Sequence, residues 1–280
     1  MPIDYRKDKR YAHLTPEQVR QHFEAEKILS QTILKAEIRE RSKTAVWAYD
    51  ELFRRIPWHP ALTEKSGPEA LETITAKVKT FLPLLPCPPA RILEVGCGMG
   101  ELSYGLAREN FECLGIDISE IRIQRLGEIT TALLHFARSD ATYLPFVDAS
   151  FDVVISMQLF EHLHPDDAVE HLREVYRILR PGGRYLLETP NKLIGPGDVS
   201  RFFVDGEAQG FHLKEYRITE LLSMLKNYGF GRIDIVLRKK KILSGRLVSI
   251  LERLWGLLPK HLRSTRTMGL HNPIYLAYKK

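Results

Sequence analysis

The chain has 280 residues, of which 44% are hydrophobic and 27% charged, enough to bury one large core. No stretch has the length of apolar sequence that a membrane-spanning helix needs, and the first ten residues lack the apolar segment of a secretory signal, so we expect a cytoplasmic protein. Cys87, Cys97 and Cys113 form no C-x-x-C pair, which argues against a disulfide framework or a thiolate zinc site and predicts reduced, buried thiols.

The net charge of +6 is unevenly distributed along the chain. Residues 1–80 contain 15 Lys and Arg against 12 Asp and Glu, residues 81–237 contain 15 against 22, and residues 238–280 contain 11 against 1. A nucleic-acid enzyme usually spreads cations around its cleft, so the acidic central segment argues against a nucleic-acid partner. The basic end remains available for docking.

The first predicted element is a helix-rich stretch that begins at Thr15-Pro16, a helix start signal, and runs to Ile56. We predict that residues 1–80 form a helical cap or lid over the edge of a sheet, joined to the core through the Pro- and Gly-marked residues 56–70. The apolar residues of this stretch fall roughly on one stripe, formed by Val19, Phe23, Leu29, Ile33, Leu34, Val46, Trp47, Leu52 and Phe53.

From residue 81 onward, short β-rich runs alternate with helical patterns such as residues 168–180 and 218–230. This alternation is typical of parallel strands joined by crossover helices, so we expect an α/β domain over residues 81–280. The strand-like runs lie at residues 90–96, 112–118, 133–140, 151–157, 182–189, 231–238 and 273–280.

Three glycines in "EVGCGMG" (94–100) follow the first strand and open a helix, where a doubly wound sheet binds its ligand. The G-x-G-x-G spacing differs from the G-x-G-x-x-G of dinucleotide sites. The carboxylate of Glu94, two residues before the first glycine, makes this loop a poor phosphate cradle and favours a cationic ligand. A glycine turn with a purely structural role is the alternative.

Two further acids end the next strands. Asp117 ends the second strand, where such folds bind a pair of ribose hydroxyls, and one carboxylate can accept two hydrogen bonds there. The alternative is a helix N-cap, for which Ser119 is the better candidate. Asp140 ends the third strand.

Four motifs follow one another in the central segment: "EVGCGMG" (94–100), "DATYLPFVDASFDVV" (140–154), "FEHL" (160–163) and "LRPGG" (179–183). With them, residues 91–190 resemble the core of class I S-adenosylmethionine-dependent methyltransferases. The resemblance implies a Rossmann-like doubly wound sheet, mostly parallel with an antiparallel last strand, with S-adenosylmethionine as cofactor and S-adenosylhomocysteine as product. It covers a little over a third of the chain and says nothing specific about residues 1–80 or 239–272.

The resemblance also implies which residues hold the cofactor, from its methionine end to its adenine. These are Gly96, Gly98, Gly100 and Glu94 at the methionine moiety, Met157 and Gln158 at the sulfonium, Asp117 and Ile118 at the ribose, and Asp140 and Ala141 at the adenine.

Methyl transfer is an in-line displacement that depends mostly on positioning, although a hydroxyl acceptor benefits from a base. His162 is the first candidate, because it is expected at the carboxyl edge of the sheet, where the ligand binds, and because a histidine ordinarily titrates near neutral pH. Glu161 is placed to orient it. His212 and Tyr216 follow the fifth strand and its long loop and are further candidates. The alternative for these residues is loop packing without a catalytic role.

Residues 158–162 read Q-x-x-E-H, and with a later histidine they resemble the metal site of small-RNA 2′-O-methyltransferases, which have E-x-x-E-H. Gln158 is a poorer ligand for a hard cation than a carboxylate, so we expect no metal. The acidic core also argues against a channel for single-stranded RNA.

Residues 239–272 are an insertion before the last strand, and their apolar residues have largely helical spacing. Such a helix can lie on an anionic membrane or pack against protein, and we expect a folded helix at the rim of the site or in a homodimer, with at most weak, salt-sensitive membrane attachment. The apolar residues are Leu243, Leu247, Val248, Leu251, Leu254, Trp255 and Leu258, and the cations are Lys239, Lys240, Lys241, Arg246, Arg253, Lys260, Arg263 and Arg266.

The function that we expect is methyl transfer to an oxygen or nitrogen of a small molecule, such as a natural product, a sugar or a lipid-linked intermediate. The alternative is an RNA or protein acceptor that docks on the basic C-terminal segment. A non-catalytic cofactor-binding protein and an NAD-dependent oxidoreductase are disfavoured by the intact acidic positions and by the glycine spacing, respectively.

Overall fold

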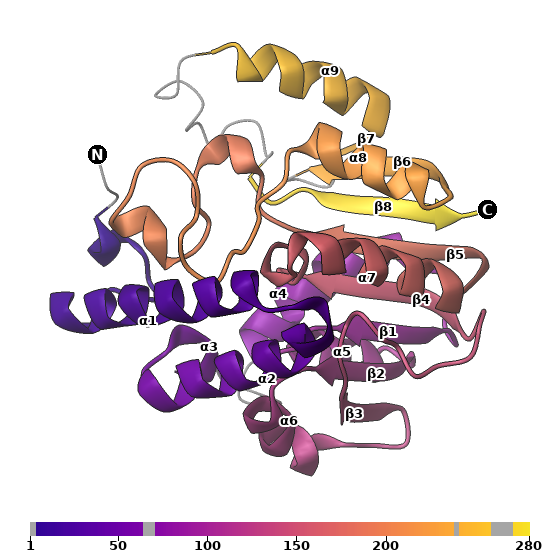
Figure 1. Ribbon diagram of the computed structural model, residues 1–280. Helices are drawn as coiled ribbons and strands as arrows, with labels where there is room; N and C mark the ends of the chain where they lie inside the picture. Colours follow the sequence, from indigo (N-terminus) through magenta and orange to yellow (C-terminus); the bar gives the residue numbers. More distant parts are fainter. Residues whose placement is uncertain (1–3, 64–70, 238–240, 259–270) are drawn as a thin grey trace.

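Figure 1 shows the computed structural model, which describes residues 4–63, 71–237, 241–258 and 271–280. Eight strands form one sheet in the order β3-β2-β1-β4-β5-β8-β6-β7. Strands β1 to β5 pair in parallel, whereas β8 runs antiparallel to β5 and β6, and β7 runs antiparallel to β6. Their bounds are β1 Arg91–Val95, β2 Glu112–Asp117, β3 Leu134–Arg138, β4 Phe151–Met157, β5 Leu179–Glu188, β6 Phe230–Leu237, β7 Lys241–Ser244 and β8 Ile274–Lys279.

Helices cover both faces of this sheet, which confirms the predicted doubly wound fold with an antiparallel last strand. On one face, α7 and α8 pack on β4 and β5 through a core that includes Leu172, Leu221 and Val154. On the other face, α5 packs on β1 through Leu106 and Ile92. The bounds are α5 Glu101–Arg108, α6 Glu120–Leu126, α7 Pro165–Ile178, α8 Ile218–Asn227 and α9 Gly245–Gly256, with short 3-10 helices at Tyr5–Lys7, Leu82–Leu84, Gly127–Ile129, Phe160–His162, Lys192–Ile194 and Val199–Phe202.

The N-terminal part is helical, as predicted, and consists of α1 Pro16–Lys35, α2 Ile38–Arg55, α3 Pro60–Thr63 and α4 Leu71–Phe81. Helix α1 begins where predicted, because Thr15 and Gln18 form a reciprocal capping box. Helices α1 and α2 pack on each other through Leu29 and Leu52, and Figure 1 shows the pair lying beside the carboxyl edge of the strands. Leu34 and Trp47, placed on the apolar stripe by the sequence, are exposed.

Helix α4 lies with the sheet rather than with the α1–α2 pair. A Cβ atom at Gly105 of α5 would lie 2.4 Å from a side-chain atom of Val78 and 2.7 Å from one of Ile74, so this glycine lets the two helices approach closely. Because α4 spans Leu71–Phe81, the predicted boundary at residues 80/81 falls inside its last turn. Residues 64–70 of the predicted connection lie outside the described residues.

The C-terminal insertion contains strand β7, which we did not predict, and helix α9. Helix α9 contacts α8, β6 and β7, and none of its residues lines the cleft described below, so it does not form the rim that the sequence suggested. Lys239, Lys240, Lys260, Arg263 and Arg266 lie outside the described residues. Within the described ranges, every helix is too short or too polar to span a bilayer.

The three cysteines are free thiols. Cys97 and Cys113 are buried, as predicted, but Cys87 is exposed, because it lies in the loop that precedes β1.

Candidate functional site

A cavity of about 390 Å³ lies at the carboxyl ends of the parallel strands, beneath α1 and α2. Its floor includes Glu94 from β1, Asp117 from β2 and Met157 from β4, and its cover includes Ile33 from α1 and Tyr49 from α2. The volume is in the range of small-ligand sites. We call this cavity the cleft.

Most of the residues predicted from the sequence meet in the cleft. Those that line it are Glu94, Gly96, Gly98, Asp117, Ile118, Asp140, Ala141, Met157, Gln158, His162 and His212.

Three predicted site residues do not line the cleft. Gly100 faces β3, where a Cβ atom would lie 2.6 Å from the ring of Phe136. Glu161 is fully buried behind the wall, where its carboxylate accepts a hydrogen bond of 2.8 Å from the hydroxyl of Thr189. Tyr216 is buried in the core against Phe160, so the position that we predicted for it at the reacting atoms is wrong. The backbone of Tyr216 forms an isolated β-bridge with Asn191. The sequence did not reveal this bridge.

The glycine loop is held against the end of β2 by backbone hydrogen bonds. Gly96 and Gly98 have φ values of 74° and 57°, the left-handed region that favours glycine. The backbone N–H groups of Gly96 and Cys97 donate to the carbonyl of Ile116 over 2.7 and 2.9 Å, and that of Gly98 donates to Oδ2 of Asp117 over 3.0 Å. The loop therefore lies directly on the cleft floor, with no side chain on either glycine between backbone and ligand.

Asp117 is buried, and its carboxylate is held in a fixed orientation. Oδ1 accepts from the N–H of Ser119 over 2.9 Å, and Oδ2 also accepts from the Arg122 guanidinium over 3.3 Å. Ser119 is the N-cap of α6, as predicted, and accepts from the N–H of Arg122. Asp117 lines the cleft floor.

Glu94 is a buried carboxylate in the cleft wall. Its Oε2 accepts from the N–H of Ser103 over 3.0 Å and from the Ser103 hydroxyl. Burial raises the pKa of Glu94 to about 7, although Ser103 and the nearby Lys77 ammonium oppose the shift. Because a cation nearby stabilises the ionised form, this side chain suits a positively charged ligand.

The cap contacts the cleft through residues that the sequence analysis missed. Ser42 of α2 donates a hydrogen bond to Oδ2 of Asp140. The Arg41 guanidinium lies 2.6 Å from Oδ1 of Asp167 and 3.3 Å from Oδ2 of Asp166, at the start of α7. These partners are about a hundred or more positions apart, so no local pattern could have revealed them.

His162 and His212 lie side by side in different charge states. Nδ1 of His162 donates to the carbonyl of Phe211 over 2.9 Å, and burial with the neighbouring charge of His212 lowers the pKa of His162 to about 3. Nδ1 of His212 lies 2.6 Å from Oε1 of Glu215. Burial alone would lower the pKa of His212, but the bond to Glu215 and the carboxylates of Glu161 and Asp198 raise it to about 9. At neutral pH, His162 is therefore a neutral ring and His212 a fixed cation.

Ligand atoms of Glu161, His162 and His212 lie within 4.8 Å of one another, as the similarity to an RNA methyltransferase metal site suggested. In this structure His212 is engaged by a carboxylate outside the group, because its Nδ1 lies 2.6 Å from Oε1 of Glu215. Gln158 does not join the group, and its amide lies 3.4 Å from Oε1 of Glu188.

Residues 92–183 match the family described as "Methyltransferase domain". With the fold, the glycine loop and the acids at the ends of β1, β2 and β3, this match supports the assignment of residues 92–183 as the core of a class I S-adenosylmethionine-dependent methyltransferase, as the motifs predicted. S-adenosylmethionine is the cofactor of that family.

Two relatives and one solved structure illustrate the similarity. A probable S-adenosylmethionine-dependent methyltransferase of Mycolicibacterium smegmatis is 32% identical over 145 residues, which are 51% of this chain and 53% of that protein. The chloroplastic tocopherol O-methyltransferase of Arabidopsis thaliana is 38% identical over 105 residues, 35% of this chain and 30% of that protein. The chain therefore matches about half of the first relative's length and less than a third of the second's.

The solved structure is a SAM-dependent methyltransferase from Archaeoglobus fulgidus, with a TM-score of 0.55 and 22% identity over 74% of this chain and 94% of that one. At that identity, the likeness concerns the fold.

Proposed function

We propose that this protein transfers a methyl group from S-adenosylmethionine to a hydroxyl group of a small, ring-containing molecule. The observation that carries the proposal is the neutral imidazole of His162 at an enclosed, aromatic part of the cleft. The name of the tocopherol O-methyltransferase relative is consistent with such an acceptor.

The acceptor would occupy the part of the cleft that the cofactor residues leave open. Five rings line the cleft beside aliphatic and charged residues such as Leu52 and Asp198, and such rings favour stacking or edge contacts with a flat molecule. Because α1 and α2 cover it, a compact acceptor fits better than a polymer. The rings belong to Tyr11, Tyr49, Phe53, His59 and Phe211.

The residues on the cleft floor fit the cofactor. Gly96 and Gly98 would hold its methionine moiety near Glu94, and Asp117 would accept from its ribose hydroxyls. S-adenosylmethionine supplies a methyl group on a sulfonium, and when the acceptor oxygen takes that carbon, the electron pair of the broken C–S bond stays on sulfur as a neutral thioether.

The chain's own contribution is to position the acceptor and to take its proton. The carbonyl of Phe211 holds the proton of His162 on Nδ1, so Nε2 carries the lone pair that accepts the hydroxyl proton. His212 keeps its charge through Glu215 and so keeps His162 unprotonated before the acceptor binds. An amine acceptor, the second possibility from the sequence, would need no such base.

The test is to incubate the purified protein with methyl-labelled S-adenosylmethionine and a panel of phenols, sugars and amines, with and without RNase. We expect labelled small-molecule product and an equal amount of S-adenosylhomocysteine, insensitive to RNase. Label that appears only in RNA or protein would overturn the proposal in favour of the alternative, an acceptor docked on the basic C-terminal segment. Failure to bind S-adenosylhomocysteine in calorimetry would overturn the cofactor assignment itself.

A further inference from the structure

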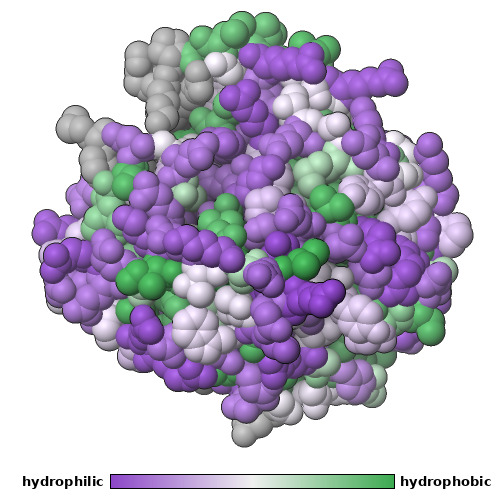
Figure 2. Space-filling model, viewed as in Figure 1, coloured by the Kyte–Doolittle hydropathy of each residue, from purple (hydrophilic) through white to green (hydrophobic). Residues whose placement is uncertain are grey.

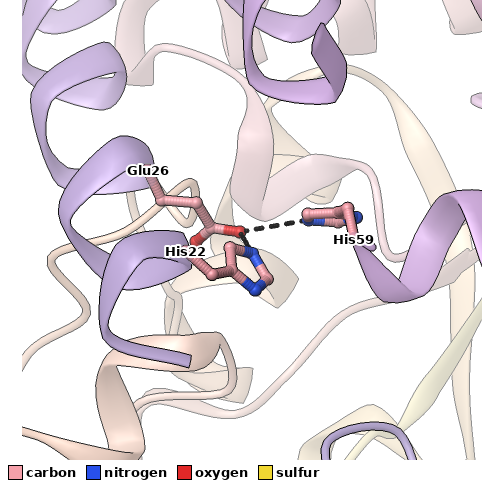
Figure 3. A group of neighbouring side chains, drawn as sticks. All are labelled: His22, Glu26 and His59. Carbon is pink, nitrogen blue, oxygen red and sulfur yellow. Dashed lines mark hydrogen bonds and ion pairs between the residues drawn. The ribbon is translucent and has the colours of Figure 1, made fainter. Parts of the chain in front are cut away.

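His22, Glu26 and His59 form a largely buried cluster in the cap, shown in Figure 3, where the carboxylate of Glu26 contacts both rings. Nε2 of His22 lies 2.7 Å from Oε1 of Glu26, and Nε2 of His59 lies 3.4 Å from the same oxygen. His22 and Glu26 come from one face of α1, and His59 precedes α3. Glu26 and His59 also line the cleft.

The hydrogen bonds of the cluster argue against a metal ion. Nδ1 of His59 accepts from the N–H of Ala61 over 3.1 Å, so in the neutral ring the proton sits on Nε2. A nitrogen that carries a proton cannot ligate a metal. Burial lowers the pKa of His59 to about 4, which keeps the ring neutral. The cluster is therefore a carboxylate that accepts from imidazole N–H groups.

The other oxygen of Glu26 extends this network to the predicted base. Oε2 accepts from the N–H of Phe211 over 3.0 Å, across 185 residues of sequence. The carbonyl of Phe211 in turn accepts from Nδ1 of His162 over 2.9 Å. The approach is close, because a Cβ atom at Gly210 would lie within 2.6 Å of both the Glu26 and Asp198 carboxylates.

We propose that Glu26 is a positioning residue: it fixes the Phe211 backbone and so holds His162 with its proton on Nδ1 and its lone pair on Nε2. Through Glu26 and Phe211, helix α1 of the cap determines the proton position on His162, which follows β4. The inference rests on the proposed function for its catalytic consequence, but the proton position on His162 exists without any acceptor.

The first test is a measurement on the unaltered protein, in which nitrogen-15 NMR of the histidine side chains reports which nitrogen of His162 is protonated at neutral pH. We expect the Nδ1–H form. A dominant Nε2–H form would overturn the proposal whether or not any variant folds.

The second test is Glu26→Gln, which has one carbonyl oxygen and so cannot accept from both the histidines and Phe211. We expect mixed tautomers of His162 and a kcat lowered about 10- to 100-fold, because a partly populated tautomer loses only part of a general-base contribution of about 10²- to 10⁴-fold, with the Kd for S-adenosylhomocysteine unchanged. Glu24→Gln, an exposed acid on the same helix, is the control and should change nothing.

An unchanged His162 tautomer in folded Glu26→Gln protein would overturn the proposal. So would calorimetric zinc binding that Glu26→Gln abolishes, because the cluster would then be a metal site. If no acceptor is ever methylated but the tautomer still shifts in Glu26→Gln, the proposed function fails and the positioning role stands.

A second, independent inference concerns helix α9, which has apolar residues on two faces. Val248 and Trp255 are buried against the domain. Glu252 is also buried and accepts from the N–H groups of Ile218 and Thr219, each over 2.7 Å, at the start of α8. These contacts fix which side of α9 faces outward.

The outward side of α9 carries an apolar stripe. Leu247, Ile250, Leu254 and Leu257 are 45%, 57%, 58% and 81% exposed, and their spacing of three and four residues places them in one line. Figure 2 shows apolar side chains at the top of the molecule, where α9 lies in Figure 1. The apolar face of this helix, expected from the sequence to pack against protein, is buried only on its inner side.

We infer that this outward face of α9 binds the surface of an anionic lipid bilayer. Arg246 and Arg253 are exposed on the same helix. Residues 238–280 contain 11 Lys and Arg and a single acid, Glu252, which is turned inward. An apolar stripe beside cations is the pattern of helices that lie in a membrane interface. A second copy docked on this face would bring like charges together.

The test is flotation of the protein with phosphatidylcholine vesicles that contain or lack phosphatidylglycerol. We expect binding to the anionic vesicles only, weakened by salt, and reduced about tenfold or more by Ile250→Ser with Leu254→Ser. Ile28→Ser, at an exposed apolar residue of α1, is the control. No binding at low salt would overturn the inference, as would a dimer in light scattering that the same double substitution dissociates.

Discussion

Replacing Asp117 by Ala tests the cofactor end of the cleft, and its effects on folding and on binding can be separated. In the structure, this carboxylate accepts from the N–H groups of Gly98 and Ser119 and from the Arg122 guanidinium. Its removal leaves two backbone donors without that partner, each worth about 1–3 kcal/mol when buried, so we expect the free energy of unfolding to fall by about 2–6 kcal/mol. A domain in the middle or upper part of the ordinary stability range, about 5–15 kcal/mol, remains folded after this loss.

The substitution also weakens binding of the cofactor, because the hydrogen bonds between Asp117 and the ribose hydroxyls are lost. Hydrogen bonds to a charged group contribute about 1.5–3 kcal/mol, so we expect the Kd for S-adenosylhomocysteine to rise about 10- to 150-fold. Calorimetry measures the Kd, and urea unfolding measures the stability. Asp117→Asn is the matched variant, because its single carbonyl oxygen keeps part of the backbone contacts while the charge is lost. A folded Asp117→Ala protein with an unchanged Kd would refute the ribose assignment.

Three further predictions concern other walls of the cleft. Gly98→Val should abolish cofactor binding, because φ is 57° there and the new side chain would project over the floor, whereas Gly127→Ala, at negative φ with no atom within 4 Å, should bind normally in calorimetry. The affinity for S-adenosylmethionine should be full above pH 7 and fall as the pH drops through about 7. The reason is that burial raises the pKa of Glu94 to about 7, and the positively charged cofactor binds more tightly when this side chain is ionised. Glu94→Gln should show no such pH dependence. Arg41→Ala should speed amide hydrogen exchange in α2, because the ion pairs with Asp166 and Asp167 at the start of α7 are lost, and unchanged exchange would mean that the apolar core alone holds the cap.

Most strands of the sheet could be predicted from the sequence, because the pattern that identifies each of them lies within a few consecutive residues. Each strand of the core is a short apolar run bounded by turn residues, and the acids that end β1, β2 and β3 lie next to those runs in the chain. Strand β7 was missed because it is a four-residue strand at the edge of the sheet, beside β6. Its residues have no alternation long enough to distinguish them from the start of the helix that follows.

The residues that sequence reasoning misplaced or missed depend on tertiary contacts. Tyr216 lies four residues after His212, yet His212 lines the cleft while Tyr216 enters the core against Phe160. The charge on His212 depends on Glu215, Glu161 and Asp198, which no spacing rule brings together. Local periodicity reports which face of an element is apolar, but it does not report what that face meets.

The polar contacts of the cap explain why the N-terminal helices shape the acceptor part of the cleft as much as the sheet does. Five parallel strands end at this edge, and the cap contacts the segments that follow four of them, through one polar cap residue for each segment. Because these partners come from separate loops, the position of α1 and α2 fixes the spacing between the walls, and a change of cap sequence alone can change which acceptor fits. The contacts are Asp50 to Ser119 after β2, Ser42 to Asp140 after β3, Arg41 to Asp167 after β4, and Glu26 to Phe211 after β5.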